Sequence, residues 1–199
     1  MRHPAWVLAY HGCDKATGEA ILAGKEDILP SNNDYDWLGS GAYFWENSYS
    51  RALEWAEFLQ KRPGISRIPI KNPFVIGAII DPGNCLDLSE NSSLQILKEA
   101  HGNLESVFKS LRWKLPANER GHSNDRDLVK RKLDCAVINF LHRMRRRRRQ
   151  PPFHTVRCPF MEGDYLFDGS RFHAKTHLQW CARNPKKHIW AYFRPRHLE

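Results

Sequence analysis

The apolar, β-branched run from Pro73 to Ile80 does most to constrain how this chain can fold. The turn sequence Asp81-Pro82-Gly83 ends it, and a run of this length suits a buried central strand. Four other short runs have the same strand-like character, at residues 5–10, 165–167, 177–182 and 188–193. Glycines flank a further aromatic strand at residues 41–45.

Two segments between these strands have the apolar spacing of helices. The first covers residues 15–22, with Asp14 as its expected N-cap and Gly24 at its end. The second covers residues 50–61 and is closed by Arg62-Pro63-Gly64. Strands alternating with helices predict an α/β fold.

The length of 199 residues suits one domain covering residues 1–199. Helical patterns at residues 93–111 and 125–143 predict a helical insertion at about 93–143, with a polar loop at 116–124. Five consecutive arginines follow at 145–149, and then Gln150 and two prolines. We therefore expect the frayed end of a helix that enters an exposed basic loop at about 144–152.

Composition narrows the class of protein. No apolar run approaches the ~20 residues of a membrane-spanning helix, and the start of the chain has no leader pattern, which predicts a cytoplasmic protein without a membrane partner. The five cysteines are widely spaced without a Cys-x-x-Cys pair, so we expect reduced, mostly buried thiols and no metal site.

The net charge of +9 favours polyanionic partners such as RNA or DNA. Arg145, Arg146, Arg147 and Arg148 are the expected phosphate contacts in the basic loop. The same run could instead be a solvated segment, a site for an acidic partner protein such as an antitoxin, or a localisation signal.

Two short motifs near the start of the chain fit together. Tyr10-His11-Gly12 ends the first strand, and Gly39-Ser40-Gly41-Ala42-Tyr43-Phe44 leads into the next. Each motif alone is common, because glycines flank many strands. Their order, their spacing and the helix after each one make the combination informative.

This combination resembles the NAD-binding half of ADP-ribosyltransferases of the poly(ADP-ribose) polymerase and diphtheria-toxin type. The resemblance covers residues 5–60 and, more loosely, the C-terminal quarter. It implies two packed, split antiparallel sheets with flanking helices, and NAD as the co-substrate without a metal.

Carried over by position, the resemblance assigns roles to several residues. His11 would bind a ribose hydroxyl of NAD, and the backbone of Gly12 would bind the nicotinamide carboxamide. Tyr43 would stack on the nicotinamide ring, Trp55 would cover its other face, and Ser50 would contact the nicotinamide side or the pyrophosphate. A glycine at position 12 leaves room for the flat ring. The alternative is that Tyr43, Phe44 and Trp55 are core residues.

The third catalytic position of the family is usually a glutamate on a late strand. Here the matching residue is Gln179, with His177 as a substrate-binding residue on the same strand face after the loop 167–176. A glutamine can hold a hydroxyl but adds no full charge. The required acid could therefore come from elsewhere. Three residues before or within the loop are candidates: Glu162, Asp164 and Asp168.

Other residues are expected around the cleft. The loop 31–38 is either a turn-rich surface segment or a wall near the adenosine half, and Arg51 is either a pyrophosphate ligand or a solvated helix residue. Four basic residues are expected along the rim: Arg157, Arg171, Lys175 and Arg183.

The sequence therefore predicts a mono-ADP-ribosyltransferase that modifies a base of RNA or DNA. Its small size resembles toxins of toxin–antitoxin or phage-defence systems, and Arg171 and His177 are expected at the acceptor side. Protein modification is the first alternative, although His177-x-Gln179 replaces the Glu-x-Glu pair of arginine-modifying relatives. The second is an inert module that binds NAD and nucleic acid.

Overall fold

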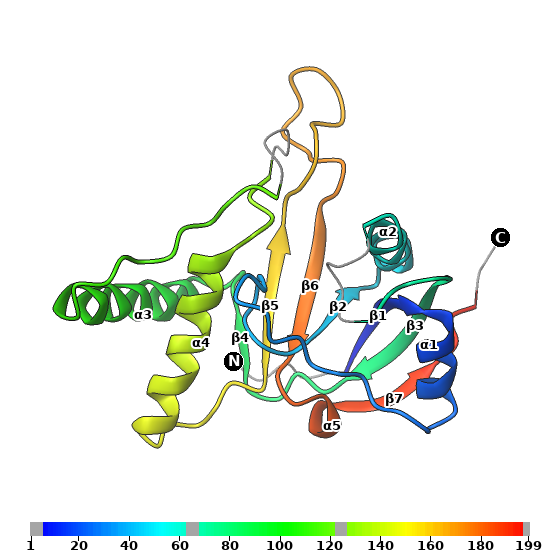
Figure 1. Cartoon of the computed structure of the whole chain (residues 1–199), viewed down its shortest axis with the longest axis horizontal. Helices are drawn as coiled ribbons and strands as arrows, with labels where there is room; N and C mark the ends of the chain where they lie inside the picture. Colours follow the sequence, from blue (N-terminus) through cyan, green and yellow to red (C-terminus); the bar gives the residue numbers. More distant parts are fainter. Residues whose placement is uncertain (1–5, 63–67, 122–126, 197–199) are drawn as a thin grey trace.

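The computed structural model describes residues 6–62, 68–121 and 127–196 (Figure 1). Its elements follow the chain in the order β1 Val7–Asp14, α1 Lys15–Leu22, β2 Ala42–Glu46, α2 Tyr49–Gln60, β3 Pro73–Ile80, β4 Cys85–Asp87, α3 Asn91–Ser110, α4 Lys132–Arg147, β5 Thr155–Phe160, β6 His177–Ala182, α5 Pro185–His188 and β7 Ile189–Phe193. The expected stop at Pro63-Gly64 and the strand residue Ala5 lie outside the described residues.

The seven strands form one open sheet in the order β4-β5-β6-β2-β1-β3-β7, which confirms the α/β class. All neighbouring pairs are antiparallel except β4 and β5. The expected division into two separate sheets is wrong, because β2 pairs with both β6 and β1. The connection to β1 is narrow, however, with only Ala9↔Glu46 and Tyr10↔Trp45 in register.

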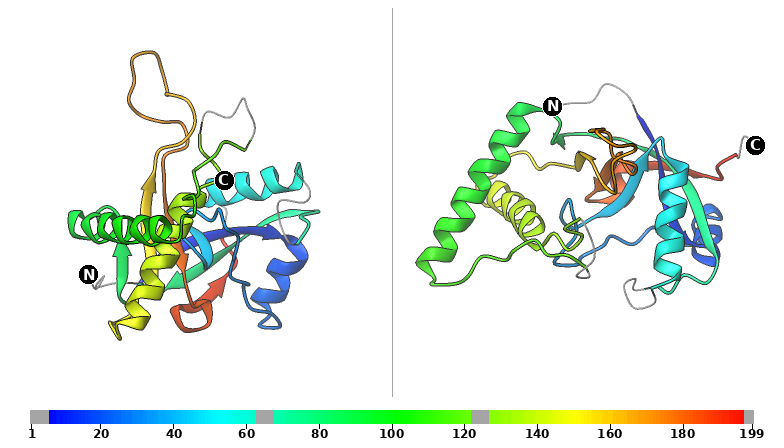
Figure 2. Two further views of the ribbon diagram at one scale, coloured as in Figure 1. Left: turned by 60° about the vertical axis from the view of Figure 1, so that its left-hand side comes forward. Right: turned by 90° about the horizontal axis from the view of Figure 1, so that it is seen from above.

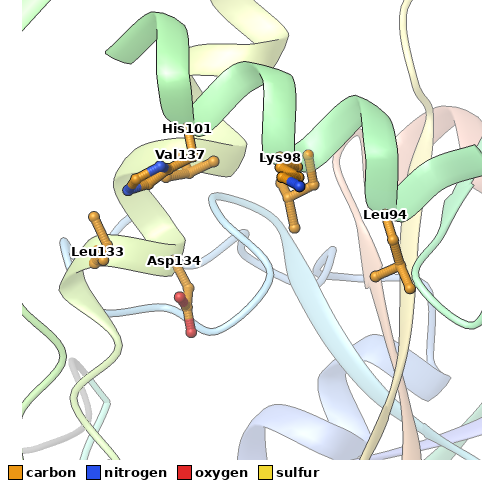
Figure 3. Close-up of a pocket in the computed structure, with 7 residues that line it drawn as sticks. Leu94, Lys98, His101, Leu133, Asp134 and Val137 are labelled. Atoms are coloured by element: carbon orange, nitrogen blue, oxygen red, sulfur yellow. The ribbon is translucent and has the colours of Figure 1, made fainter. Parts of the chain in front are cut away.

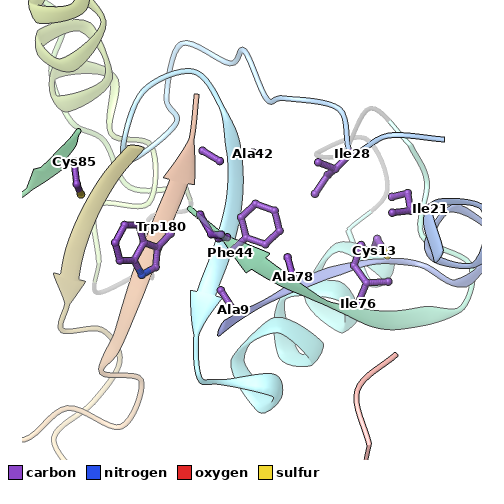
Figure 4. Packing of buried hydrophobic residues seen from close by; sticks show 12 residues of the cluster. Ala9, Cys13, Ile21, Ile28, Ala42, Phe44, Ile76, Ala78, Cys85 and Trp180 are labelled. Carbon is purple, nitrogen blue, oxygen red and sulfur yellow. The ribbon is translucent and has the colours of Figure 1, made fainter. Parts of the chain in front are cut away.

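Helices cover the sheet unevenly (Figures 1 and 2). One face of the β1–β3–β7 side packs against α1, where Ile21 joins a buried cluster that includes Phe44 and Trp180 (Figure 4). The opposite face carries α2 against β1 and β3, and α4 with α3 behind it against the β4–β6 side. A strip of β2 and β6 therefore lies between α2 and α4.

Predictions that depend only on residues within one segment are confirmed by the structure. The bounds of α1, β3 and β6 are as expected. Asp14 caps α1 by accepting from the backbone N–H of Ala16 at 2.9 Å, and Gly24 adopts φ 69° just after the helix. The cysteines are free thiols, four of them buried.

The helical insertion differs in its boundaries. α4 begins at Lys132 rather than near Asp125, which lies outside the described residues. It continues through Arg147, so the basic loop expected from 144 is wrong at its start. Cations at a helix C-terminus are favoured by the helix dipole, and the guanidinium of Arg145 donates to the carbonyl of Pro151.

The C-terminal half also departs from expectation. β4 and β5 were not predicted, and the strand-like piece Tyr165–Phe167 belongs to the long loop between β5 and β6 that projects at the top of Figure 1. Among the described residues, no helix is long and apolar enough to cross a membrane.

Candidate functional site

The strip between α2 and α4 carries a line of polar side chains. Trp45 of β2 pairs with Tyr10 of β1 on one side and with Gln179 of β6 on the other, so their side chains share one face of the sheet. His177 lies two residues from Gln179 and is on that face too. Gln179 and His177 are each only 7% exposed.

Three polar atoms in this line are buried without a hydrogen-bond partner in the described structure: Trp45 Nε1, His177 Nε2 and Gln179 Oε1. Buried polar groups are normally paired, because an unpaired one costs about 1–3 kcal/mol. A group of such atoms on one face is therefore an arrangement that a polar ligand could complete.

Glu162 joins this group from the β5–β6 loop. Its carboxylate lies 3.1 Å from the guanidinium of Arg51 and 3.5 Å from Nδ1 of His177. Burial raises the pKa of Glu162, while the charge of Arg51 lowers it. The structure thus places one of the three alternative acids beside the predicted catalytic strand, whereas Asp164 and Asp168 are exposed on the loop.

His177 is held in one tautomer. Its Nδ1–H donates to the carbonyl of Lys175 at 2.8 Å, which leaves Nε2 as an unprotonated acceptor. Burial lowers the pKa of His177 to about 4, so the ring is neutral at physiological pH. A neutral imidazole with a free lone pair can accept a hydrogen bond or a proton.

The edge between β1 and β2 opens directly after the Tyr10–Trp45 pair. The backbone N–H of Asn47 donates to the carbonyl of Leu8 across β1 and β2. Backbone groups point to the same side of a strand at every second residue, so Gly12 on β1 and Tyr43 on β2 direct theirs toward each other across the opening. His11 partly bridges the opening, because its Nδ1–H donates to the carbonyl of Tyr43 at 2.8 Å.

Strand alternation places His11 on the face opposite Gln179. Its ring lies 5.6 Å from that of Phe44, on the α1 side of the sheet. The structure therefore brings Gln179, His177 and Glu162 together, while His11 reaches them only through the open edge. Burial lowers the pKa of His11, which keeps the imidazole neutral.

Gly12 has a packing reason beyond the one expected from the sequence. A Cβ at this position would meet the backbone carbonyl of Ala52 on α2, at a distance no atom could tolerate. The direction of that missing side chain is toward α2 and not into the open edge. Close helix packing is thus what requires a glycine here.

The predicted aromatic residues divide between core and surface. Phe44 is fully buried, in agreement with the core alternative. Tyr43 is half-buried against the cluster under α4, and its hydroxyl donates to the carbonyl of Gly39 and accepts from the N–H of Leu38. Trp55 is 41% exposed with its ring 6.1 Å from that of Trp45, and Ser50 is exposed at the start of α2.

Of two arginines at the site, the sequence left one between two alternatives and did not indicate the other. Arg51 pairs with Glu162 and also with Glu54, so it is not a solvated helix residue. Arg131, just before α4, was not singled out at all. Its guanidinium lies 3.9 Å from the ring of Trp37 and 4.8 Å from that of Phe160.

The other predicted basic residues lie elsewhere. Arg145 to Arg148 end α4 at the side of the molecule away from the β5–β6 loop (Figure 1), so they do not join the polar group. Arg157 is on the opposite face of the sheet, paired with Glu46 at 2.9 Å and Asp87 at 3.1 Å. Arg171 and Lys175 are exposed on the loop, and Arg183 follows the far end of β6.

The described residues form a cavity but no group of side chains that could hold a metal ion. The cavity, of about 230 Å³, lies between α3 and α4 (Figure 3). It is lined by Leu94, Leu97, Leu133 and Val137 together with Lys98, His101 and Asp134. Within the described ranges, no three His, Cys, Asp or Glu residues are grouped to hold a metal ion.

Comparison with known proteins adds little to this geometry. No family model and no solved structure matches the chain. One relative, an uncharacterized protein of Methanocaldococcus jannaschii, is 44% identical over 55 residues. The match covers 28% of this chain and 25% of the relative, so it spans a minor part of both.

Proposed function

We propose that this chain is a mono-ADP-ribosyltransferase that moves ADP-ribose from NAD to a base of RNA or DNA and releases nicotinamide. The open edge between β1 and β2 carries the proposal. The backbone of Gly12 faces that edge, where the carbonyl of Tyr43 accepts from His11, near three buried polar atoms that lack a partner among the described residues. The motifs that resemble ADP-ribosyltransferases fall on these same strands.

We place the nicotinamide half of NAD at the open edge. A carboxamide needs a donor and an acceptor side by side, and the N–H and C=O of one strand residue, Gly12, supply both. The aromatic pair Trp45 and Trp55 borders the same strip. His11, on the other face, is suited to a hydroxyl of the second ribose.

In the reaction, the bond between the ribose anomeric carbon and the nicotinamide nitrogen breaks, and its electron pair leaves with nicotinamide. Gln179 Oε1 can accept from a ribose hydroxyl, and the carboxylate of Glu162 opposes the positive charge that develops. The acceptor nucleophile then bonds to the anomeric carbon, and its proton can pass to Nε2 of His177.

The choice of a nucleic-acid acceptor rests on charge. The net charge is +9, and consecutive arginines end α4. The β5–β6 loop, on another side of the molecule, carries Arg171 and Lys175. That loop also exposes aromatic side chains, with Phe167 64% and Phe172 71% exposed, which suits base stacking. We further propose that the protein acts in the cytoplasm as a toxin of a toxin–antitoxin or phage-defence system.

The direct test is incubation of the purified chain with NAD labelled in the adenosine half and with RNA, DNA or lysate protein. Nicotinamide release with label in RNA or DNA supports the proposal. Label in protein alone would move the acceptor to the alternative class. Toxicity on expression, relieved by His11→Ala, is the expected result for a toxin.

One observation favours a second function. The position that carries a glutamate in the resembling family is Gln179, which adds no charge to the site. An inert module that binds NAD and nucleic acid would tolerate this change. Tight NAD binding without any nicotinamide release, in the presence of each acceptor, would favour that function over catalysis.

A further inference from the structure

Arg131 is the most unusual cation near the polar group. It precedes α4, and its backbone N–H donates to the carbonyl of Tyr35 at 3.3 Å, which connects it to the loop 31–38. Its guanidinium lies against the rings of Trp37 and Phe160, at 3.9 and 4.8 Å. The two aromatic rings therefore fix the plane of the guanidinium without neutralising its charge.

The N–H groups of this guanidinium make few contacts with the described residues. Nε is buried without a partner in the described structure. The contact with Asp134 is long, 3.8 Å from Nη1 to the carboxylate, and beyond hydrogen-bond distance. An arginine whose face is held by two rings, whose Nε has no partner among the described residues and whose Nη1 makes only a long ion pair is suited to an anion with paired oxygens, such as a phosphate.

The position of Arg131 in the fold indicates which phosphate group it could bind. Phe160 pairs with His177 across β5 and β6, and their rings are 5.6 Å apart, so Arg131 borders the polar group. Trp37 belongs to the loop 31–38, for which a wall near the adenosine half of NAD was one of the two expectations. The diphosphate is the part of NAD that links its two halves, and it is the anionic part.

We propose that Arg131 binds the diphosphate of the NAD donor and that Trp37 and Phe160 hold it in place. This assignment rests on the proposed function. It makes the helical insertion part of the donor site, because α4 and the chain just before it supply the arginine. Arg131 is then a donor-binding residue, separate from the nicotinamide end of the site.

The test measures binding of the two parts of the donor, ADP-ribose and nicotinamide, separately. Binding of ADP-ribose and of nicotinamide to the full chain is measured by calorimetry for wild type, Arg131→Gln and the control Arg143→Gln, an exposed residue of α4. Arg131→Gln is expected to weaken ADP-ribose binding by roughly 10-fold or more and to leave nicotinamide binding within about twofold. The control should leave both unchanged.

Equal ADP-ribose affinity in wild type and Arg131→Gln would overturn the assignment. If Arg131→Gln loses both ligands, Arg131→Lys decides, because it keeps the charge and most of the aliphatic stem. Retained nicotinamide binding with at least about threefold weaker ADP-ribose binding then supports the role of the planar fork. Unchanged ADP-ribose binding by Arg131→Lys, or loss of nicotinamide binding as well, overturns it. Failure of wild type to bind either ligand would instead contradict the proposed function.

Discussion

The Nδ1 atom of His11 lies 2.8 Å from the carbonyl oxygen of Tyr43, although the ladder between their strands ends one residue earlier at Tyr10 and Trp45. A side chain here replaces a backbone hydrogen bond. The imidazole thus keeps β1 and β2 together at one point while leaving the backbone edge beside it open. His11 therefore has both a structural and a proposed ligand-binding role.

His11→Ala separates these roles. Loss of one hydrogen bond costs about 1 kcal/mol, which lowers the melting temperature by roughly 2–4 °C in a chain of this size. Nicotinamide release is expected to fall at least about tenfold, as for loss of a ribose contact. Thermal unfolding and nicotinamide release measure the two effects. The control is His101→Ala on α3; an equal loss of activity there would count against a specific role.

Gln179 tests whether a neutral amide serves in catalysis. Gln179→Ala removes the oxygen proposed to accept from ribose, and nicotinamide release is expected to fall about tenfold or more. Gln179→Glu restores a full charge near the developing cation and is expected to reach at least the wild-type rate. The measurement is kcat for NAD consumption at saturating NAD. A silent Gln179→Ala would remove this residue from the proposed mechanism.

Glu162 is distinguished from the other two acids by its contacts with Arg51 and His177. Glu162→Gln is expected to lower kcat by roughly 100-fold, because it removes the charge opposing the cation. Because Glu162 also pairs with Arg51, thermal unfolding of Glu162→Gln is measured beside kcat, which separates a loss of stability from a loss of catalysis. Asp168→Asn, on the exposed loop, is the matched control and should stay near the wild-type rate.

Local patterns in the sequence were sufficient for α1, β3 and β6, because their caps, turns and apolar runs lie within each segment. They were insufficient for β4, a three-residue strand whose pairing with β5 depends on distant residues. The same limit applies to the site. Gln179 and His177 were found by strand position, but Arg131 has no local signal, since Trp37 and Phe160 become its neighbours only in the folded chain.

The basic run shows a second reason for a wrong prediction. Consecutive like charges suggested a frayed helix end that passes into a loop from about residue 144, yet Arg145, Arg146 and Arg147 form the last turn of α4. The helix dipole favours cations there, and the ring of Phe153 lies 4.1 Å from the guanidinium of Arg145. Tertiary contact outweighed the repulsion that the sequence alone implied.

His142 predicts a pH dependence of stability. It is 5% exposed, neither ring nitrogen has a partner in the described structure, and burial lowers its pKa to about 3, with Arg183 contributing. The unfolded chain binds a proton near pH 6.5, whereas the folded chain does not until near pH 3, so stability falls as pH drops through this window. Between pH 7 and pH 5, this residue accounts for about 2 kcal/mol.

The measurement for His142 is urea unfolding at pH 7 and pH 5. His142→Leu is expected to flatten the difference between the two pH values by about 2 kcal/mol relative to wild type. His177 remains in both proteins, so its own contribution, with a pKa of about 4, cancels in the comparison. An unchanged pH dependence in the variant would show that His142 is solvated or paired in the folded chain.

The end of α4 makes a prediction about nucleic acid that is independent of NAD. Arg146, Arg147 and Arg148 are exposed, and a triple change to glutamine removes three charges from one surface. If this surface binds phosphates, the slope of log affinity for single-stranded RNA against log salt should fall by about 2. The control is a triple change of Lys15, Lys25 and Lys61 to glutamine, which removes the same charge elsewhere. Equal weakening by both variants would mean that RNA responds to net charge alone, whereas a specific loss with unchanged nicotinamide binding would assign this surface to the acceptor.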